Sequence, residues 1–192
     1  LLNEDPVKTE GGLSSGNAGE SSNFLCYRAL RLNYYAVTGL LARVCLYAGQ
    51  RENAFNYSTE VIKASNNGIF PFVDRSLVNG TAQDPDRIFS PEVLFALSDS
   101  QRGELFEEYV DPSLAPNMVF RMETDLLEQT IYGGTGTGGN LDDYRCRSNW
   151  ISSGSARYFY KYSDMTESGR IENTMIPLLR LGEMYLIAAE SQ

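Results

Sequence analysis

The pattern of apolar residues between positions 33 and 64 predicts two amphipathic helices. In the first, apolar residues recur at three-and-four spacing and so share one face: Val37, Leu40, Leu41, Val44, Cys45 and Ala48. Gly49 can adopt the left-handed conformation that ends a helix. In the second helix the pattern comprises Ala54, Tyr57, Val61 and Ile62 and stops at Asn66-Asn67-Gly68. A linker of about four residues makes the two helices antiparallel, so we expect a helical hairpin over 33–66.

This hairpin partly matches the tetratricopeptide helix pair. That motif has Leu-Gly followed by Tyr three residues later, and a small residue near the start of its second helix. Leu41, Ala42, Cys45 and Ala54 stand at these positions, and Ala42 is small enough to allow close approach of the helices. Thr38 replaces the usual Trp, so the match is partial.

The same pattern returns near the end of the sequence, where residues 181–186 align with residues 41–46. The three-and-four spacing is repeated by Leu178, Leu181, Gly182, Tyr185, Leu186 and Ala189, and Pro177 suits the first turn of a helix. The sequence stops at Gln192, where a partner helix should begin, and a solenoid helix without a partner exposes its apolar face. We therefore expect these 192 residues to be part of a longer protein.

The residues between these helical stretches predict a loop-rich insertion with short elements. Residues 1–23 are polar and predict a long loop, while 24–32 are expected to lead into the first helix without a sharp break. Within the insertion we expect a strand over 90–97, an edge strand or extended segment over 69–73, a short helix over 122–129 and a short strand over 156–162.

Three stretches resemble signatures of the SusD/RagB family, nutrient-binding lipoproteins on the outer surface of Bacteroidetes. RLNYYAV (31–37) running into LARVCLYAG (41–49) resembles one signature, and IPLLRLGEMYLIAAE (176–190) resembles the other. Between them, Asp143-Tyr144-Arg145 with Trp150 and YKY (160–162) resembles the segment that precedes the second signature. The stretches occur in the family order, and the resemblance extends over most of the chain from Asp5 onward.

The resemblance implies a mostly α fold, a SusD-like α-α superhelix of tetratricopeptide-like hairpins with long loop-rich insertions that carry short strands. We expect residues 1–192 to be a portion of a single SusD-like domain whose N- and C-terminal parts are missing. Within it, 33–66 would be a tetratricopeptide-like hairpin, 67–174 the insertion, and 175–192 the first helix of a further repeat.

The resemblance also implies a function at the cell surface. The protein would bind an oligosaccharide or polysaccharide and deliver it, without catalysis, to a SusC-like TonB-dependent transporter. It would sit at the outer membrane through a lipid anchor outside this segment and would need no cofactor. Two alternatives are a tetratricopeptide-like scaffold that binds peptides or proteins, which would need contiguous repeats, and a glycoside hydrolase, which would need a positioned pair of carboxylates.

Composition narrows the classes of partner. With 16 basic and 25 acidic residues, the net charge of −9 argues against nucleic acid and anionic membranes as partners. The apolar runs are far shorter than the roughly 18 residues that a membrane span needs. No signal peptide or lipidation cysteine stands at the start, which fits a missing N-terminal portion. Cys26, Cys45 and Cys146 lack metal-ligand spacing and are interpreted as structural thiols.

Catalytic interpretations find little support. Histidine is absent, so serine and cysteine nucleophiles lack their usual base, and zinc sites lack their commonest ligand. The neighbouring carboxylates Glu107-Glu108, Asp142-Asp143 and Glu123 with Asp125 are more typical of solvated surface than of a glycosidase pair. The glycine-rich stretch 133–139 formally contains G-x-G-x-x-G but lacks a preceding strand and a following helix, so we interpret it as a loop.

Aromatic residues offer the best candidates for sugar binding, since sugar rings stack on aromatic faces while their hydroxyls bond to polar side chains. Trp150, flanked by Asn149 and Arg147, has this chemistry, as do Tyr132 and Tyr144 around the glycine-rich stretch. The alternative, which we favour for Trp150, is a core anchor of the insertion.

Other residues are assigned structural roles. These are Leu41, Ala42, Gly49, Ala54, Arg180, Glu183 and Tyr185, and Tyr34, Tyr35 and Tyr57 also follow helical spacing. Arg180 and Glu183 lie three residues apart and can pair. Glu183 also corresponds to Arg43 in the repeat alignment, which suggests an ion pair between the two related helices.

Overall fold

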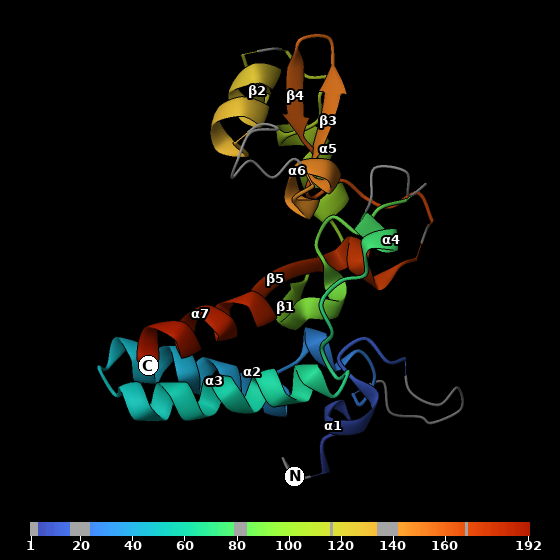
Figure 1. Ribbon diagram of the computed structural model, residues 1–192. Coiled ribbons are helices and arrows are strands. Elements are labelled where there is room, and N and C mark those ends of the chain that lie inside the picture. Colours follow the sequence, from blue (N-terminus) through green and yellow to red (C-terminus); the bar gives the residue numbers. More distant parts are fainter. Residues whose placement is uncertain (1–3, 16–23, 79–83, 116, 134–141, 168) are drawn as a thin grey trace. The chain divides into compact units, whose positions relative to one another are not determined.

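The chain divides into two compact units, each described separately below. The computed structural model describes residues 4–15, 24–78, 84–115, 117–133, 142–167 and 169–192 (Figure 1). The first unit comprises Leu1–Val73, Phe89–Ser98 and Met175–Gln192, and the second comprises Asp74–Ile88 and Asp99–Thr174. Residues 89–98, expected within the insertion, therefore belong to the first unit.

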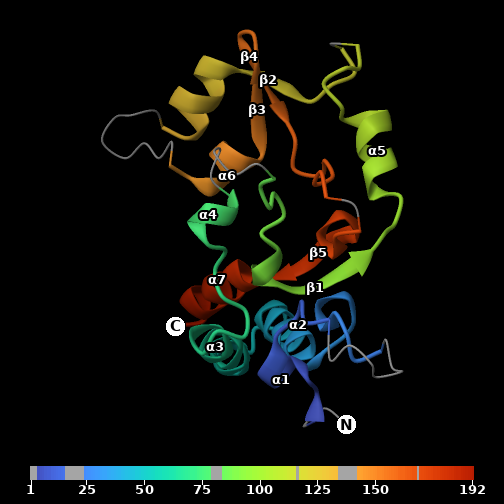
Figure 2. The same ribbon diagram turned by 90° about the vertical axis from the view of Figure 1, so that its right-hand side faces the viewer.

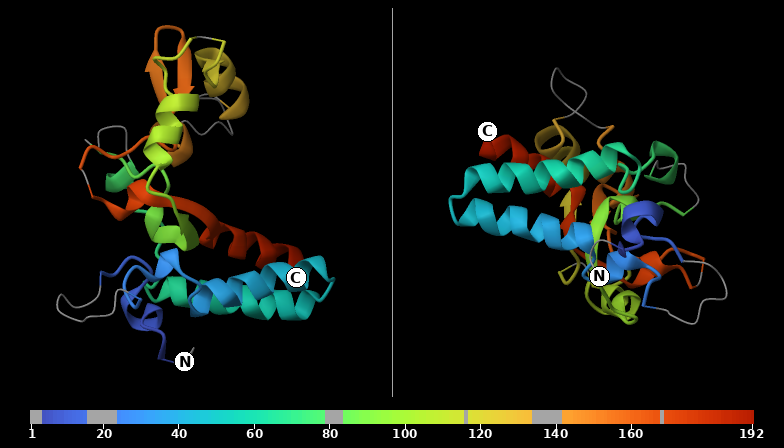
Figure 3. Two further views of the ribbon diagram at one scale, coloured as in Figure 1. Left: turned by 180° about the vertical axis from the view of Figure 1, so that it is seen from behind. Right: turned by 90° about the horizontal axis from the view of Figure 1, so that it is seen from below.

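The first unit is built on the expected helical hairpin. Its helices α2 (Tyr34–Tyr47) and α3 (Arg51–Asn66) lie side by side (Figure 3), and α7 (Leu181–Ser191) packs mainly along α3. The remaining elements are α1 (Val7–Glu10), a 3-10 turn (Arg28–Leu30), a second 3-10 turn (Ser90–Glu92), and the antiparallel strands β1 (Val93–Ser98) and β5 (Met175–Arg180).

Local sequence explains where the two hairpin helices begin and end. The side chain of Asn33 caps α2, because its Oδ1 accepts a hydrogen bond from the Ala36 amide at 2.9 Å. Its Nδ2 donates to the carbonyls of Arg28 and Leu94, both at 2.9 Å, so this fully buried amide also fixes the chain around the cap. Gly49 follows α2 with φ 71°, as expected of a helix stop, and Gly68 follows α3 with φ 84°.

The entry to α2 differs from the expectation. Residues 24–32 do not lead smoothly into the helix, since a 3-10 turn ends at Leu30 and Arg31 is extended. The buried ion pair between Arg28 and Asp5, at 3.0 Å, holds this turn, and Asp5 also accepts the amide of Tyr34 at 2.9 Å. Asp5, which is distant in sequence, thus holds the 3-10 turn that precedes α2.

The buried face of α2 also differs from the expectation. The helix buries Ala36, Thr38, Gly39, Ala42 and Cys45, whereas Leu40, Leu41, Val44 and Ala48 are exposed. The buried face carries small residues because α2 packs closely against its neighbours. A Cβ on Gly39 would lie 2.9 Å from Leu179 Cδ2 and 3.1 Å from Met184 Sδ. Of the assigned structural residues, Ala42 and Ala54 are fully buried, and Leu41 is not.

The core of the first unit joins residues distant in sequence. Its buried members are Val7, Ala42, Cys45, Ala54, Val61, Phe70, Leu94, Leu179, Leu181, Met184 and Ile187. Phe70 belongs to the segment 69–73, which forms no strand. The strand expected over 90–97 begins three residues later, at Val93, after the 3-10 turn.

The last helix begins later than expected. Pro177 lies in β5 opposite Ala96 of β1, and not in the first turn of a helix. Arg180 is extended and precedes α7, which buries Leu181, Met184 and Ile187. Tyr185 and Leu186, expected on the core face, are exposed, although the Tyr185 ring contacts Phe72 with centroids 5.4 Å apart.

The second unit contains a small antiparallel sheet in the order β2-β4-β3 (Figure 2). The strands are β2 (Arg121–Glu123), β3 (Trp150–Ser153) and β4 (Ala156–Phe159), so the strand expected over 156–162 is shorter. The helical elements are α4 (Arg75–Val78), α5 (Arg102–Tyr109), a π-helix (Leu126–Ile131), α6 (Tyr144–Ser148) and a 3-10 turn (Ile171–Thr174). The helix expected over 122–129 is therefore replaced by β2 followed by the π-helix.

Three further features bear on function. None of the described helices combines the length and apolarity that crossing a membrane requires. The described residues hold no group of three or more His, Cys, Asp or Glu side chains that could bind a metal ion. Among the described residues, Cys26, Cys45 and Cys146 form no disulfide bond, and the latter two are buried.

Candidate functional site

Trp150 lies in an aromatic cluster of the second unit. It is the first residue of β3 and is 9% exposed. Its ring contacts Phe159 across the strand pair, with centroids 5.3 Å apart, and Phe120, at 5.7 Å. These contacts are typical of a core aromatic residue, and they occupy the indole surface that a sugar would need.

Asn149 likewise makes its hydrogen bonds within the protein. It is buried and its Oδ1 accepts a hydrogen bond from Ser148 Oγ at 3.2 Å. Its carbonyl accepts the amide of Tyr160 at 2.8 Å. The residue therefore links α6 to the chain that follows β4.

Tyr132 lies close to the indole of Trp150. Burial raises the pKa of Tyr132, whose ring is half-buried. The structure thus brings Trp150, Tyr132 and Asn149 together. Of the glycine-rich stretch beside Tyr132, residues 134–139 lie outside the described part of the chain.

Tyr144 and Arg147 lie on α6, where they are half-buried and exposed. Asp143 caps this helix by accepting the amide of Arg145 at 2.8 Å, and its carboxylate also pairs with the Arg145 guanidinium at 2.6 Å. Arg147 pairs with Asp142 at 2.5 Å. Of the five candidates, Arg147 is exposed, Tyr132 and Tyr144 are half-buried, and Asn149 and Trp150 are buried.

The same ion pairs bear on the carboxylates considered for catalysis. The hydrogen bonds from Arg145, despite an opposing effect of burial, hold the pKa of Asp143 below its usual range. A general acid in a glycosidase needs a raised pKa, so Asp143 is poorly suited to that role. Glu107 and Glu108 are exposed on α5.

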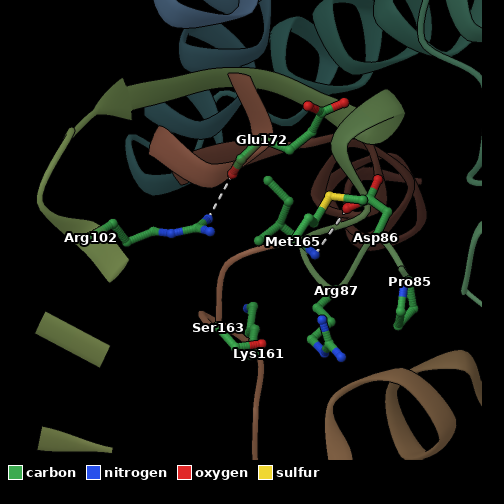
Figure 4. Close-up of a pocket in the computed structure, with 9 residues that line it drawn as sticks. Pro85, Asp86, Arg87, Arg102, Lys161, Ser163, Met165 and Glu172 are labelled. Atoms are coloured by element: carbon green, nitrogen blue, oxygen red, sulfur yellow. Dashed lines mark hydrogen bonds between the residues drawn. The ribbon is translucent and has the colours of Figure 1, made fainter. Parts of the chain in front are cut away.

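A second feature of this unit was missed in the sequence. A small hollow is lined by Asp86, Arg87, Arg102, Lys161, Ser163 and Glu172, among others (Figure 4). Its free volume of about 10 Å³ admits roughly one water molecule. The YKY stretch 160–162, noted only for its resemblance, supplies part of the wall, while nothing in the sequence around Arg87 marks that residue.

Two cations that line this hollow, Arg87 and Lys161, lie near tyrosine rings. The Arg87 guanidinium lies 5.1 Å from the centroid of the Tyr160 ring, and the Lys161 ammonium lies 5.3 Å from that of Tyr162. Arg102, only 5% exposed, donates to the Glu172 carbonyl at 2.7 Å (Figure 4) and to Asp164 at 3.1 Å. Burial lowers the pKa of Arg87. The hollow thus combines donors with aromatic surface.

Comparison with known proteins places this fold. No family model matches the chain, and no curated protein matches it. A solved structure from Bacteroides vulgatus ATCC 8482, provisionally named as a sugar-binding protein, is 25% identical with a TM-score of 0.52 over 83% of this chain. A SusD superfamily protein from Bacteroides thetaiotaomicron VPI-5482 is 24% identical over 85% of the chain, with a TM-score of 0.48. A SusD-like carbohydrate-binding protein from Bacteroides vulgatus ATCC 8482 is 19% identical over 93%, with a TM-score of 0.47.

The chain shares its fold with the first of these structures over 83% of its length. The chain spans about a third of the length of these structures, with 34%, 37% and 36% of each covered. A shared fold does not by itself identify a ligand, which depends on residues such as Trp150 and Arg87.

Proposed function

We propose that this chain belongs to a glycan-binding protein of the bacterial cell surface. The observation that carries the proposal is the fold shared with a protein named for sugar binding, at 25% identity and a TM-score of 0.52. The second unit adds suitable chemistry, since Tyr144 offers an aromatic ring and Arg147 a hydrogen-bond donor on one short helix. The protein would capture its ligand by stacking and hydrogen bonding, without catalysis.

The hairpin would serve a different purpose. In this proposal α2 and α3 form a tetratricopeptide-like pair, and the chain is a portion of a single SusD-like domain attached to the outer membrane by a lipid anchor outside it. A SusC-like TonB-dependent transporter would receive the glycan. The exposed apolar residues Leu40, Val44 and Tyr47 on α2 suit a protein partner better than a sugar.

The same exposed residues also favour the alternative of a tetratricopeptide-like scaffold that binds peptides. The two proposals differ in the ligand that the protein binds. A scaffold would bind an amphipathic peptide through α2 and would ignore glycans, whereas the proposed function requires that a glycan be bound in the absence of any peptide.

Affinity electrophoresis tests the proposal. The protein is run through native gels that contain one of a panel of polysaccharides, and reducing ends are assayed in parallel. We expect retardation by one glycan class without new reducing ends, and weaker retardation of the Tyr144→Ala and Arg147→Ala variants. Arg121→Ala, at an exposed arginine of β2, is the matched control. Failure to bind any glycan would refute the proposal, and new reducing ends would refute its non-catalytic mechanism.

A further inference from the structure

Arg87 differs from the other arginines that are removed from solvent. Among the described residues, each other buried or half-buried arginine has a carboxylate partner: Arg28 with Asp5, Arg43 with Glu183, Arg102 with Asp164, Arg157 with Glu128, Arg170 with Glu172, and Arg180 with Glu92. Within the same part of the chain, Arg87 has no such partner. Its Nε is buried and makes no hydrogen bond there.

An unpaired guanidinium in this position costs free energy. A cation that has lost part of its hydration is normally compensated by a carboxylate or by several hydrogen bonds. The Tyr160 ring, 5.1 Å from the guanidinium carbon, compensates in part through a cation–π contact. A ring face cannot accept the N–H bonds at the guanidinium edge, so the donors of Arg87 remain available to a ligand.

The acidic groups around the hollow do not fill this role, because each is engaged elsewhere. Asp86 accepts the amide of Ile88 at 3.1 Å, and Glu172 pairs with Arg170 at 3.1 Å. Asp84 accepts the amide of Thr166 at 3.0 Å. Asp164 pairs with Arg102 at 3.1 Å. These carboxylates lower the positive potential of the hollow but leave the Arg87 fork without an acceptor.

The Arg87 guanidinium favours an anion. Lys161 and Ser163 also line the hollow (Figure 4), but the Ser163 hydroxyl already donates to the Tyr160 carbonyl at 3.0 Å. The guanidinium fork matches the two oxygens of a carboxylate or the oxygens of a sulfate ester. With a free volume of about 10 Å³, the hollow holds roughly one water molecule, so an anionic group would meet the guanidinium at the mouth of the hollow.

We propose that Arg87 binds the anionic substituent of an acidic glycan, a carboxylate or a sulfate ester. This inference rests on the proposed glycan binding and adds the class of sugar. The sugar ring would remain outside the hollow, and its charged group would contact the guanidinium at the mouth of the hollow. The overall charge of −9 does not oppose this, because screening limits the field of distant charges to about 8 Å at physiological salt. Of the nearby carboxylates, Asp164 and Glu172 are paired with arginines.

Calorimetric titration with three oligosaccharides of equal length tests the inference. One carries carboxylates (an oligogalacturonate), one carries sulfate esters and no carboxylate (a κ-carrageenan oligosaccharide), and one is neutral (a cello-oligosaccharide). We expect the protein to bind at least one acidic ligand more tightly than the neutral one. Arg87→Gln should weaken that binding about tenfold or more, because charge-assisted hydrogen bonds are lost. The preferred ligand distinguishes carboxylate from sulfate.

Two further variants make the result specific to Arg87. Arg51→Gln removes the same charge from an exposed position on α3 and should leave the affinity unchanged. Arg87→Lys keeps the charge but loses the fork, so it should bind with intermediate affinity, and it replaces Arg87→Gln if that variant fails to fold. Thermal melting checks folding, and we expect Arg87→Gln to be no less stable than the wild type.

The outcomes separate the inference from the proposed function. Acidic binding that Arg87→Gln leaves intact, or binding of the neutral ligand alone, would overturn the inference while the glycan-binding proposal stands. Binding of no glycan, in this titration and in the gel panel, would overturn both. Acidic binding that depends on Arg87 and not on Arg51 would support both.

Discussion

Arg43 of α2 and Glu183 of α7 form a bidentate ion pair between the two helices with related sequences. The Nε–Oε1 distance is 2.6 Å and the Nη2–Oε2 distance is 2.7 Å. Arg43 Nη2 also donates to the Leu178 carbonyl at 3.0 Å. The repeat alignment predicted this pair. Arg180 and Glu183 do not pair with each other, because Arg180 is extended before α7 and lies 3.7 Å from Glu92 instead.

Replacing Glu183 should destabilise the first unit. Both side chains are only about one third exposed, at 32% for Arg43 and 31% for Glu183, so Glu183→Gln would leave a partly desolvated guanidinium with a weaker acceptor. We expect the free energy of unfolding to fall by about 1–2 kcal/mol in urea denaturation. Arg43→Gln and the double variant complete a thermodynamic cycle that isolates the pair. A loss below about 0.5 kcal/mol would mean that it behaves as an ordinary surface pair.

Two glycines offer a matched test of the packing of α2. Gly39→Ala should destabilise by about 1–3 kcal/mol, since the new methyl group would crowd Leu179 and Met184 by more than the gain in helix propensity offsets. Gly182→Ala on α7 meets nothing within 4 Å and should stabilise by up to about 1 kcal/mol. Denaturation curves of both variants measure the difference. Equal effects would contradict the close approach at Gly39.

Features set by local chemistry could be predicted from the sequence. The spacing of apolar residues located α2 and α3, and Gly49 and Gly68 marked their ends, because helix periodicity and left-handed glycines depend on neighbours along the chain. The choice of buried face could not be predicted the same way. Leu40 and Val44 have the greater hydrophobicity, but Gly39 and Ala42 allow the closer approach, and only the packed partners decide between them.

Long-range pairing and desolvation account for the other differences between the expected and the observed structure. Pro177 lies in a strand because β5 pairs with β1, which is distant in sequence, and this outweighs the preference of proline for a first helical turn. Trp150 and Tyr132 were selected by residue type, and the structure does bring them together. Arg87 was missed because an unpaired, half-buried guanidinium is defined by its surroundings in the fold and has no signal in the chain.

The stability of the first unit should depend on pH through Asp5. Burial raises the pKa of this carboxyl, but hydrogen bonds from Arg28 and from the amides of Val7 and Tyr34 outweigh burial and hold the pKa below its usual range. A group with a depressed pKa in the folded state stabilises above its unfolded pKa of about 3.9 and loses that contribution as the pH falls through the folded pKa. Acid should therefore weaken the fold.

Comparing Asp5→Asn with the wild type measures this contribution. Near neutral pH the variant should be less stable by about 2–4 kcal/mol, since Arg28 would keep a buried charge without its partner. The difference should begin to shrink as the pH falls below about 4, where this carboxyl becomes protonated in the unfolded chain, and should vanish below the depressed pKa of the folded state. Urea denaturation at several pH values provides the data. A difference that stays constant with pH would show that the charge of Asp5 does not contribute.

Substituting Trp150 should mainly reduce stability if it is a core residue, and substituting Tyr144 should mainly reduce glycan binding if it is a ligand contact. Trp150→Ala should reduce the stability of the second unit by about 3–5 kcal/mol, because it removes a buried indole from its contacts with Phe120 and Phe159. Tyr144→Ala, at a half-buried position on α6, should cost less than about 1.5 kcal/mol and should weaken glycan retardation in native gels. Trp150→Phe is the control, since it keeps an aromatic ring in the cluster. If Trp150→Phe weakened glycan binding while leaving stability intact, the indole would be a ligand contact after all, and the aromatic cluster itself would be the binding surface.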